Sequence, residues 1–353
     1  MTTVKPEQQE PASTPPRPPS MADVAGVAGV SHQTVSRVLN GLPNVREGTR
    51  ERVLEAIDQL GYRRNRAARA LVTARTSTIG ILTVGSEFFG PQSTVLAVEA
   101  AARARGYFVS VTSLERYDAD SALVALNHLV DQGVDGVVVV APLELVTEAI
   151  DDAALSLPMV VVAARPDVPA ADPVQYVFVD QRSGARQATD HLLGLGHRRI
   201  VHVSGPVGWF DAAERLRGWR ESMAAAGCDA VEAAAGDWFA ASGFEVGTRL
   251  ARQVSAGEAT AVFAANDYLA IGLLRAFWEA GLSVPDDVSV VGFDDLQSSA
   301  FFIPALTTVR QPFAEVGRTA LAALLDGADA PGAPHVLTPS LVVRGSTGAP
   351  RAS

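Results

Sequence analysis

The first part of the chain carries a helical pattern of apolar and polar positions. Apolar residues recur at helical spacing in three short stretches, namely residues 21–28, 32–39 and about 49–60. Ser20 and Ser31 directly precede the first two stretches, where side-chain oxygens cap exposed N–H groups; Gly29 ends the first. The third stretch is expected to bury one face, formed by Val53, Leu54, Ile57 and Leu60. Two helices joined by a short glycine turn, with a third to support them, predict a helix-turn-helix domain over residues 20–64.

The pattern changes at Ile79. Short runs rich in Val and Ile, such as TIGILTV, DGVVVVAP and QYVFVD, alternate with helical stretches. This alternation predicts an α/β layer with a parallel sheet. A second series follows, with the runs RIVHVSG, TAVFAAND and VSVVGFDD. Two such sheets in tandem predict a core of two doubly wound lobes with a cleft between them, as in periplasmic binding proteins.

Composition narrows the class of protein. The chain has 353 residues, 48% hydrophobic and 19% charged, which is typical of a globular protein with a substantial core. Its single cysteine, Cys228, excludes a disulfide framework and a cysteine metal cluster. No apolar run reaches the ~18–20 residues that a membrane helix needs. The polar, proline-rich residues 1–19 predict a disordered tail and lack a secretory signal, so we expect a cytoplasmic protein. Residues 346–353 are expected to form a second disordered tail.

The charge is divided unevenly along the chain, whose formal net charge is −10. Residues 1–76 hold 11 Lys and Arg against 7 Asp and Glu, whereas residues 77–353 hold 18 against 32. A basic head on an acidic body is the asymmetry expected of a DNA-binding module joined to a domain of another kind.

The second predicted helix carries side chains suited to DNA. In a helix-turn-helix domain, the N-terminal part of this helix enters the major groove. His32, Gln33 and Arg37 are long enough to reach base edges there, since arginine bridges the two acceptors of guanine and glutamine pairs with adenine. The short hydroxyl side chains suited to phosphate oxygens are Ser31, Thr34 and Ser36. The alternative is a solvated helix face with ordinary caps.

A basic segment follows the domain. Tyr62 to Thr76 contains five arginines together with a short strip of alanines and Leu71. An isolated helix of this length is marginal in water, so residues 65–76 are expected to form a hinge helix only when docked on DNA. Leu71 is suited to act as a wedge between base steps in the minor groove. The expected DNA contacts of the hinge are Asn65, Ala68 and Leu71.

The stretches DVAGVAGVSHQTVSRVLNG, TRERVLEAIDQLGYRRNRAARAL and TIGIL resemble the head and hinge of the lactose-repressor/galactose-repressor family of bacterial regulators. The resemblance continues through most of residues 21–345. It implies that the second helix reads bases and that Leu71 inserts at the operator centre. One departure is Arg46-Glu47-Gly48, where the family usually has a serine cap before the third helix.

The resemblance also implies how the core is divided. The chain is expected to cross between the lobes three times, so that the segment after Phe313 returns to the first lobe. Lobe 1 would then comprise about residues 77–176 and 313–340. Lobe 2 would comprise about 177–312 with 341–345.

Candidate ligand residues stand at the ends of predicted strands, where open α/β sheets bind ligands. Asn266-Asp267 follows one strand and Asp294-Asp295 another, while Arg215 and Arg217 begin a helix and Trp238 is expected to be exposed in a loop. An amide, carboxylates, a guanidinium and an indole together suit a sugar. Each also has a structural alternative: Asp267 as a helix cap, Asp294-Asp295 as a turn, Trp238 as packing, and Arg217 as a solvated surface residue. Adjacent residues point to opposite sides, which excludes Asp294-Asp295 as a catalytic carboxylate pair.

The resemblance singles out some of these positions. It places Arg215, Trp238, Asn266 and Asp294 at sugar contacts. It places Gln311 and Phe313 in the cleft, where the chain recrosses, and the match at Phe88 and Pro91 in the first lobe is weaker. A family aspartate that binds the effector is replaced here by Ala163, so the effector need not be the same.

The leading hypothesis is a homodimeric transcriptional repressor that binds a palindromic DNA operator and responds to a mono- or disaccharide. No cofactor and no metal are expected. An enzyme, such as a sugar kinase or hydrolase, is disfavoured because the chain has no phosphate loop, G-x-S-x-G elbow or metal-binding helix. A transport-binding protein is disfavoured because the chain adds a DNA-binding head and lacks a signal peptide.

Overall fold

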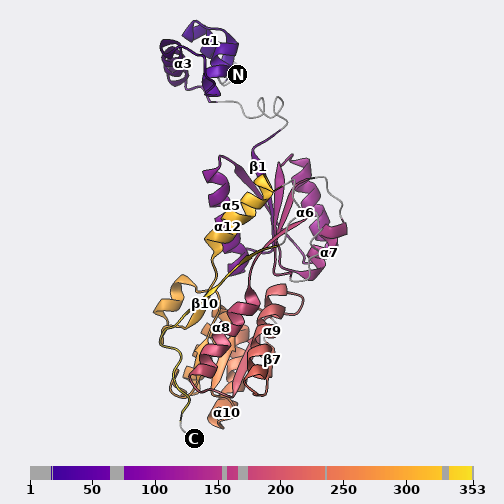
Figure 1. Ribbon diagram of the computed structural model, residues 1–353, viewed down its shortest axis with the longest axis vertical. Coiled ribbons are helices and arrows are strands. Elements are labelled where there is room, and N and C mark those ends of the chain that lie inside the picture. Colours follow the sequence, from indigo (N-terminus) through magenta and orange to yellow (C-terminus); the bar gives the residue numbers. More distant parts are fainter. Residues whose placement is uncertain are drawn as a thin grey trace, which may run out of the picture. The chain divides into compact units, whose positions relative to one another are not determined.

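The computed structural model describes residues 17, 19–63, 75–152, 157–165, 174–234, 237–327 and 334–351. The chain separates into two compact units, Met1–Ala74 and Arg75–Ser353, called here the head and the body (Figure 1). The hinge candidates Asn65, Ala68 and Leu71 lie outside the described residues.

The head is the predicted three-helix domain. Its helices are α1 (Met21–Ala28), α2 (His32–Leu39) and α3 (Glu47–Leu60). Ser20 and Ser31 cap the first two helices through their side-chain oxygens, as predicted, whereas Arg46 supplies no side-chain cap to α3. Val53 is buried as predicted, but the expectation for α3 was wrong at Leu54, which is 52% exposed, because the helix turns Ala56 into the core beside Val53.

Lobe 1 is built on a parallel sheet of six strands in the order β11-β5-β4-β3-β1-β2. The strands are β1 (Thr78–Thr83), β2 (Phe108–Ser113), β3 (Gly136–Val140), β4 (Met159–Val162), β5 (Gln175–Val179) and β11 (His335–Leu337). Helices α5 (Phe89–Ala104) and α12 (Phe313–Asp326) cover one face, and α6 (Ala119–Asp131) and α7 (Glu144–Asp152) cover the other (Figure 1). Buried Val and Ile side chains fill both faces of the sheet, as expected for parallel strands.

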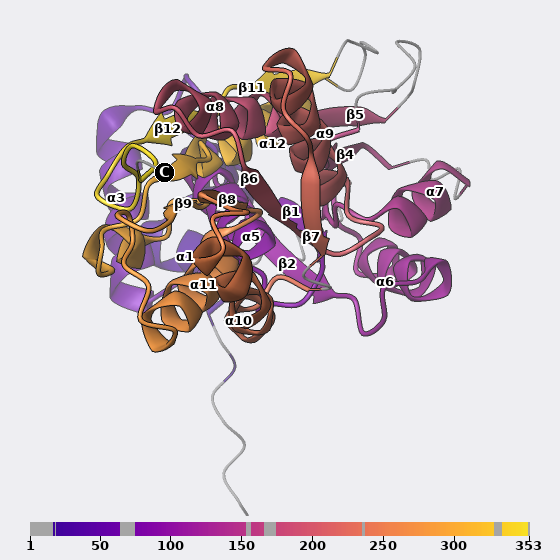
Figure 2. The ribbon, with the colours of Figure 1, turned by 90° about the horizontal axis from the view of Figure 1, so that it is seen from below.

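Lobe 2 is built on a parallel sheet in the order β7-β6-β8-β9. The strands are β6 (Ile200–Ser204), β7 (Val231–Ala234), β8 (Ala261–Ala264) and β9 (Ser289–Val291). The covering helices are α8 (Gln181–Gly194), α9 (Phe210–Ala225), α10 (Ala240–Ser255) and α11 (Asp267–Glu279), with a 3-10 turn, η1 (Gln297–Phe301). Helices α10 and α11 pack side by side (Figure 2). The predicted fold class, a three-helix head with a two-lobed α/β body, is confirmed.

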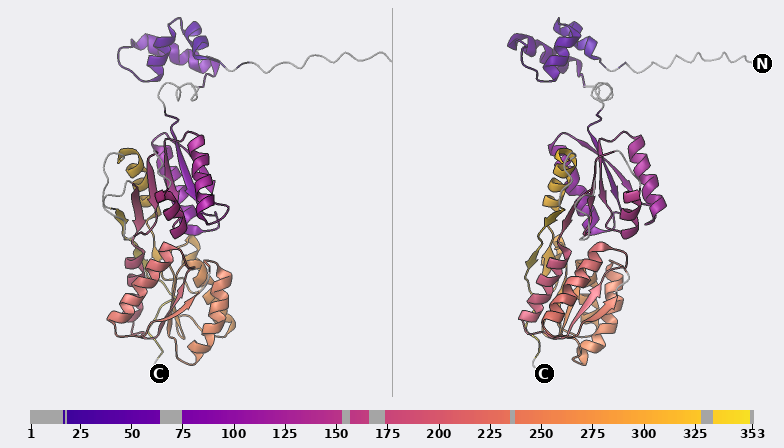
Figure 3. Two further views of the ribbon diagram at one scale, coloured as in Figure 1. Left: turned by 90° about the vertical axis from the view of Figure 1, so that its right-hand side faces the viewer. Right: turned by 45° about the vertical axis from the view of Figure 1, so that its right-hand side comes forward.

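The segments that join the lobes lie together. The chain passes from β5 to α8, from β10 (Thr308–Arg310) to α12, and from β11 to β12 (Ser340–Val342). Strands β10 and β12 pair antiparallel. Helix α12, which follows β10, packs on the lobe 1 sheet (Figure 3), where the resemblance places it. The expected limit of lobe 1 at residue 176 falls inside β5, because the whole strand to Val179 pairs with β4 and β11.

The C-terminal residues differ from expectation. Residues 346–353 were expected to be a disordered tail, of which 352–353 lie outside the described residues, but Ser346 is fully buried. The Val290 N–H donates to the Ser346 carbonyl at 2.8 Å, and the Ser289 hydroxyl accepts from Gly348 N–H at 3.0 Å. The segment therefore pairs with the backbone at β9, the edge of the lobe 2 sheet, and covers groups that an edge strand would leave open.

None of the helices in the described part of the chain is long and apolar enough to cross a membrane.

Candidate functional sites

Helix α2 presents its polar side chains outward. Val35 and Val38 are buried in the head core, which turns His32, Gln33 and Arg37 to the surface. The helix is amphipathic for this reason: its apolar residues are three apart and share one face. The three long side chains that the sequence assigned to base reading are thus exposed together on one helix.

The short polar residues of α2 form hydrogen bonds at the two ends of the helix. The Ser31 hydroxyl accepts from Thr34 N–H at 3.2 Å and lies 2.9 Å from the Thr34 hydroxyl. The Asn40 side chain donates to the Ser36 carbonyl at 2.8 Å. These contacts fix the start and the end of the helix, while the assignment of Ser31, Thr34 and Ser36 to phosphate contacts stays a prediction.

The eight ligand candidates that the family resemblance singled out line two adjoining compartments between the lobes of the body, whereas Asp267, Asp295 and Arg217 line neither. The first, the polar compartment, has an empty volume of about 390 Å³ and is lined by Phe88, Pro91, Arg215, Trp238, Asn266 and Asp294, among others. The second, the apolar compartment, has about 410 Å³ and is lined by Gln311 and Phe313, among others. Gly90, Pro91 and Asp211 line both, so the compartments meet at these residues.

Arg215 lies at the centre of the polar compartment's hydrogen-bond network. It is 3% exposed, and its Nε donates to Gln181 Oε1 at 2.9 Å while Nη1 donates to the Ala265 carbonyl at 2.5 Å. Its Nη2 lies 3.6 Å from Asp294 Oδ1, and its guanidinium stacks 3.8 Å from the centre of the Phe293 ring. These contacts hold a buried positive charge in one orientation.

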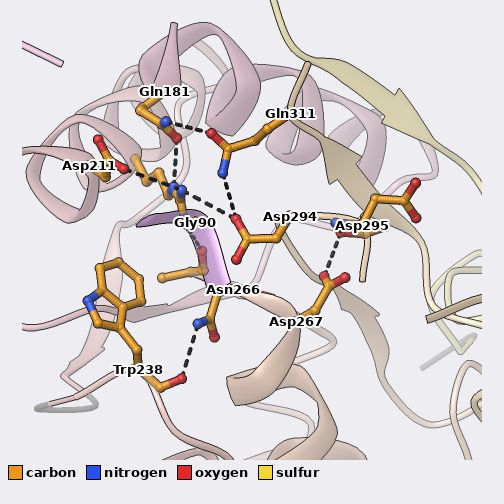
Figure 4. Close-up of polar contacts among 12 residues, drawn as sticks. Gly90, Gln181, Asp211, Trp238, Asn266, Asp267, Asp294, Asp295 and Gln311 are labelled. Atoms are coloured by element: carbon orange, nitrogen blue, oxygen red, sulfur yellow. Dashed lines mark hydrogen bonds and ion pairs between the residues drawn. The ribbon is translucent and has the colours of Figure 1, made fainter. Parts of the chain in front are cut away.

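Asp294 faces Arg215 from a strained turn. Its φ is 109°, in the left-handed region that non-glycine residues rarely adopt. Its Oδ1 accepts from Gln311 Nε2 at 2.7 Å (Figure 4). Burial raises the pKa of the Asp294 carboxyl to about 7, against the lowering effect of the nearby Arg215. A carboxyl of this kind accepts or donates a hydrogen bond near neutral pH.

Asp295 points away from Asp294, as expected for two adjacent residues at the end of a strand. Its carboxylate accepts from Arg310 and Arg344, each at 2.6 Å. It therefore ties β10 and the C-terminal segment together, and it does not line the polar compartment.

The structure assigns the helix cap to Asn266. Asn266 Oδ1 accepts from Leu269 N–H at 2.8 Å, and Nδ2 donates to the Trp238 carbonyl at 3.1 Å. The sequence had offered Asp267 as the cap. Asp267 is instead fully buried and accepts from Leu296 N–H and from the hydroxyls of Ser299 and Thr308, so it anchors α11 to the segment after β9 and to β10.

Trp238 is buried, contrary to the expectation that a loop exposes it. Its side chain packs edge to face against Trp209, with ring centres 5.6 Å apart, and Trp209 packs in the same way against Phe88 at 4.9 Å. The Trp238 Nε1 has no hydrogen-bond partner among the described residues. The polar compartment thus has an aromatic wall formed by Phe88, Trp209 and Trp238.

Sequence reasoning missed several residues of these compartments, among them Trp209, Asp211 and Gln181. Trp209 and Asp211 follow β6 in the stretch GPVGWFD, a glycine-rich loop at a strand's carboxyl end that should have drawn attention. Asp211 Oδ2 lies 4.0 Å from Arg215 Nη2, and burial raises the pKa of its carboxyl. Gln181, the first residue of α8, donates to Gln311 Oε1 at 2.9 Å; nothing in its local sequence marked it.

The described residues contain no cluster of His, Cys, Asp or Glu that could hold a metal ion. Arg217 pairs at the surface with Glu214 at 2.8 Å, which agrees with the structural alternative for that residue.

Two family models match the chain. Residues 20–65 match the bacterial regulatory proteins of the lacI family, and residues 189–347 match the periplasmic binding protein-like domain. The two matches fall on the head and mainly on lobe 2.

Individual proteins match over nearly the whole chain. The lactose operon repressor of Escherichia coli (strain K12) is 34% identical over 337 residues, which cover 95% of this chain and 92% of the relative. The HTH-type transcriptional regulator CelR of Thermobifida fusca is 36% identical over 323 residues, covering 88% and 92%. The solved lac repressor dimer bound to operator and the anti-inducer ONPF has a TM-score of 0.84 at 34% identity, covering 94% of this chain and 100% of that one. The CelR–cellobiose complex has a TM-score of 0.67 at 33% identity, covering 93% and 99%. The chain therefore belongs to the lacI family of bacterial regulatory proteins.

Proposed function

We propose that this regulator is a transcriptional repressor whose affinity for its operator is controlled by a small sugar-type effector bound between the lobes of the body. The observation that carries the proposal is the convergence of the sequence candidates. Residues from Phe88 to Phe313, separated by more than two hundred positions, line two compartments that meet.

The polar compartment has the chemistry of a sugar site. The carboxyls of Asp211 and Asp294, the amide of Asn266 and the guanidinium of Arg215 offer paired acceptors and donors for ring hydroxyls. The indoles of Trp209 and Trp238 offer an apolar surface to the C–H face of a pyranose. CelR, which resembles the chain over most of its length, was solved with cellobiose.

Effector binding acts directly on the segments that join the lobes. Gln181 and Gln311 stand at two of these crossings and are bonded to each other, to Arg215 and to Asp294 (Figure 4). An effector that replaces the hydrogen bonds of Arg215 or Asp294 leaves Gln181 and Gln311 with different partners. If the effector binds one arrangement of the lobes more tightly than another, it shifts the equilibrium toward the arrangement that it binds more tightly.

In the head, α2 enters the major groove and reads bases through His32, Gln33 and Arg37. Reading two equivalent half-sites requires two heads related by a two-fold axis, so the working unit is a homodimer on a palindromic operator. The solved lac repressor is described as a dimer bound to operator. The hinge contacts at Asn65, Ala68 and Leu71 belong to the same proposal.

The proposal includes no catalysis, in keeping with relatives that are transcription regulators. We place the protein in the cytoplasm, where its DNA is. Incubation with candidate sugars should leave them chemically unchanged, and cell fractionation should recover the protein with the cytoplasmic fraction.

A two-part experiment tests the proposal. Binding-site selection with the full-length protein should return one palindromic sequence, and light scattering at micromolar protein should give a dimer mass. A thermal-shift screen of mono- and disaccharides should then find a compound that stabilises the protein and changes its operator affinity. Absence of a selected sequence would contradict the DNA-binding part, and absence of any stabilising carbohydrate would contradict the effector part.

A further inference from the structure

The segment with which the chain enters the body is held by one carboxylate. Thr76 and Ser77 directly precede β1, and Asp135 directly precedes β3, the strand that pairs with β1. Asp135 Oδ1 accepts from Thr76 N–H at 2.8 Å, and Oδ2 accepts from Ser77 N–H at 2.9 Å. Hydrogen bonds from backbone N–H groups to an ionised carboxylate are stronger than those to a neutral acceptor. Thr76, Ser77 and Asp135 are called here the entry anchor.

Further contacts hold the entry anchor in one conformation. The Thr76 hydroxyl donates to the Gly133 carbonyl at 2.8 Å and lies 3.1 Å from Asp135 Oδ1. Ser77 has a φ of 55°, in the left-handed region that non-glycine residues rarely adopt. Such a backbone conformation persists only where the surrounding structure imposes it. The bonds to Asp135 therefore set both the position and the direction of the chain at its entry to lobe 1.

The entry anchor stands at the opposite edge of the lobe 1 sheet from the effector pocket. It lies at the amino ends of β1 and β3, whereas the pocket is lined from their carboxyl ends by Phe88, which follows β1, and by Val140, the last residue of β3. Thr76 is also the last residue of the segment 65–76 that the sequence assigned to the hinge. The place of the anchor in the chain therefore relates it to the hinge and the head, and not to the pocket.

We propose that Asp135 is a positioning residue for operator binding, which fixes the length of free chain between the body and the head. This inference rests on the proposed function, because it requires a dimer whose two heads read the half-sites of one palindrome. Once one head is bound, the other binds as a tethered group, whose effective concentration at its half-site depends on the length of the linker.

The effect of the anchor on reach is comparable to the step between base pairs. Loss of the bonds to Asp135 would free Thr76 and loosen Ser77, which adds between about 3 and 7 Å of reach to each chain, at about 3.3–3.6 Å per extended residue. Successive base pairs are about 3.4 Å apart along the duplex. The loosened chains would therefore accept half-site spacings that the anchored chains disfavour.

Operator-binding assays on the full-length protein test the proposal with Asp135→Asn. The substitution keeps the shape of the side chain but places an NH2 donor opposite one of the two backbone N–H groups. The probes are the palindrome returned by binding-site selection and the same palindrome with one base pair added or removed at its centre. The variant should lower the ratio of affinities for the selected and the altered spacings by at least about fivefold. A merely structural role would reduce the active fraction of the protein, which weakens binding to all the probes equally and leaves the ratio unchanged.

Asp131→Asn is the matched control. Asp131 is exposed at the end of α6, so the change removes the same charge close by in the chain and should leave the ratio unchanged. Asp135→Glu keeps the charge but moves the carboxylate by one methylene; it should also lower the ratio, and it replaces Asp135→Asn if a melting curve shows that variant to be unfolded. If the folded Asp135 variant keeps the wild-type ratio, or if Asp131→Asn lowers it equally, Asp135 does not position the heads.

Hydrogen exchange tests the anchor without DNA. The amides of Thr76 and Ser77 should exchange slowly in the full-length protein and at least about tenfold faster in the Asp135 variant. Fast exchange of both amides in the unsubstituted protein would overturn the anchor itself. If the amides are slow but selection returns no palindrome, the proposed function fails and the positioning role fails with it. An unchanged affinity ratio on a selected palindrome overturns the positioning role alone.

Discussion

The polar residues of helix α2 in the head and the pocket residues of the body differ in their exposure to solvent. The head places His32, Gln33 and Arg37 on the outside of one short helix, and all three are exposed. The pocket places Arg215, Asn266 and Asp294 in the interior, and each is less than a tenth exposed. A solvent-facing surface is available to a large partner such as DNA, whereas a buried network suits a small molecule that must alter the packing between lobes.

The difference has an energetic consequence. An exposed side chain of α2 contributes little to the stability of the head, so its replacement changes DNA binding and leaves the fold intact. A buried charged side chain of the pocket is bonded to several elements, so its replacement changes ligand binding and stability together. The following experiments separate these two kinds of residue.

The largest effect is expected for Arg215→Ala. The substitution removes the buried cation that faces Asp294 and Asp211, and we expect loss of effector binding by at least ~100-fold, with a stability cost of about 3–5 kcal/mol. Operator binding should persist at a temperature where the variant is folded. Calorimetry and operator-binding assays measure the two properties. Arg217→Ala, two residues along the same helix but half-exposed, is the matched control; a comparable loss of effector binding there would contradict a specific role for Arg215.

Arg37→Ala should weaken specific operator binding by about 1–3 kcal/mol and relax the preference at one base pair of each half-site. The melting curve of the protein should stay unchanged because the side chain is exposed. Binding-site selection measures the preference. Arg52 is an exposed arginine of α3, and Arg52→Ala controls for the loss of one positive charge. If the Arg37 variant keeps the original sequence preference, Arg37 does not read bases.

The buried carboxyls of the body make its stability depend on pH. Burial raises the pKa of Asp294 to about 7 and that of Asp267 to about 6, so the folded chain holds protons that the unfolded chain has released. The stabilisation is complete below about pH 4 and is lost as the pH rises through 6–7. Asp294→Asn stays neutral and should flatten this decline. Denaturant unfolding at pH 5 and pH 8 measures both proteins, and equal slopes would refute the assignment to Asp294.

The smallest effect is expected at the cap of α1. Ser20 Oγ accepts from Asp23 N–H at 3.3 Å and Ser20 N–H donates to Asp23 Oδ2 at 2.7 Å, so Ser20→Ala should cost the head about 1 kcal/mol. Hydrogen exchange of the α1 amides in the full-length protein reports the change. Gln59→Ala, at an exposed position of α3, should alter exchange by less than ~0.5 kcal/mol. Equal effects of the two changes would show that the cap contributes nothing.

The head was almost entirely predictable because its signals are local. Helical spacing, the caps Ser20 and Ser31, and the stop at Gly29 act within a few residues, and all three were confirmed. The error at Leu54 arose because two adjacent faces of α3 are apolar, and only packing against α1 decides which one is buried. That decision selected Val53 and Ala56.

The pocket was predictable only in part. Asn266 and Asp294 could be predicted because each follows a strand, and parallel strands present their carboxyl ends at one edge of the sheet. The burial of Trp238, the cap at Asn266 in place of Asp267, and the contribution of Gln181 all depend on contacts between segments distant in the chain. Gln181 and Gln311 are 130 positions apart and meet only because two crossings lie side by side.

The sequence by itself determined the three-helix head, the alternation of strands and helices in the body and the residue types available at the strand ends, because periodicity, capping and turn chemistry act over a few residues. Tertiary structure alone decided which of those residues face one another, that the segment 346–351 covers β9, and that the pocket residues line two compartments that meet. These properties depend on long-range packing, in which the surroundings of a side chain are supplied by segments hundreds of residues away. The same carboxyl at Asp294 is an ordinary acid in the unfolded chain and has a pKa of about 7 in the folded one, because burial between elements, and not the neighbouring residues in sequence, sets its environment.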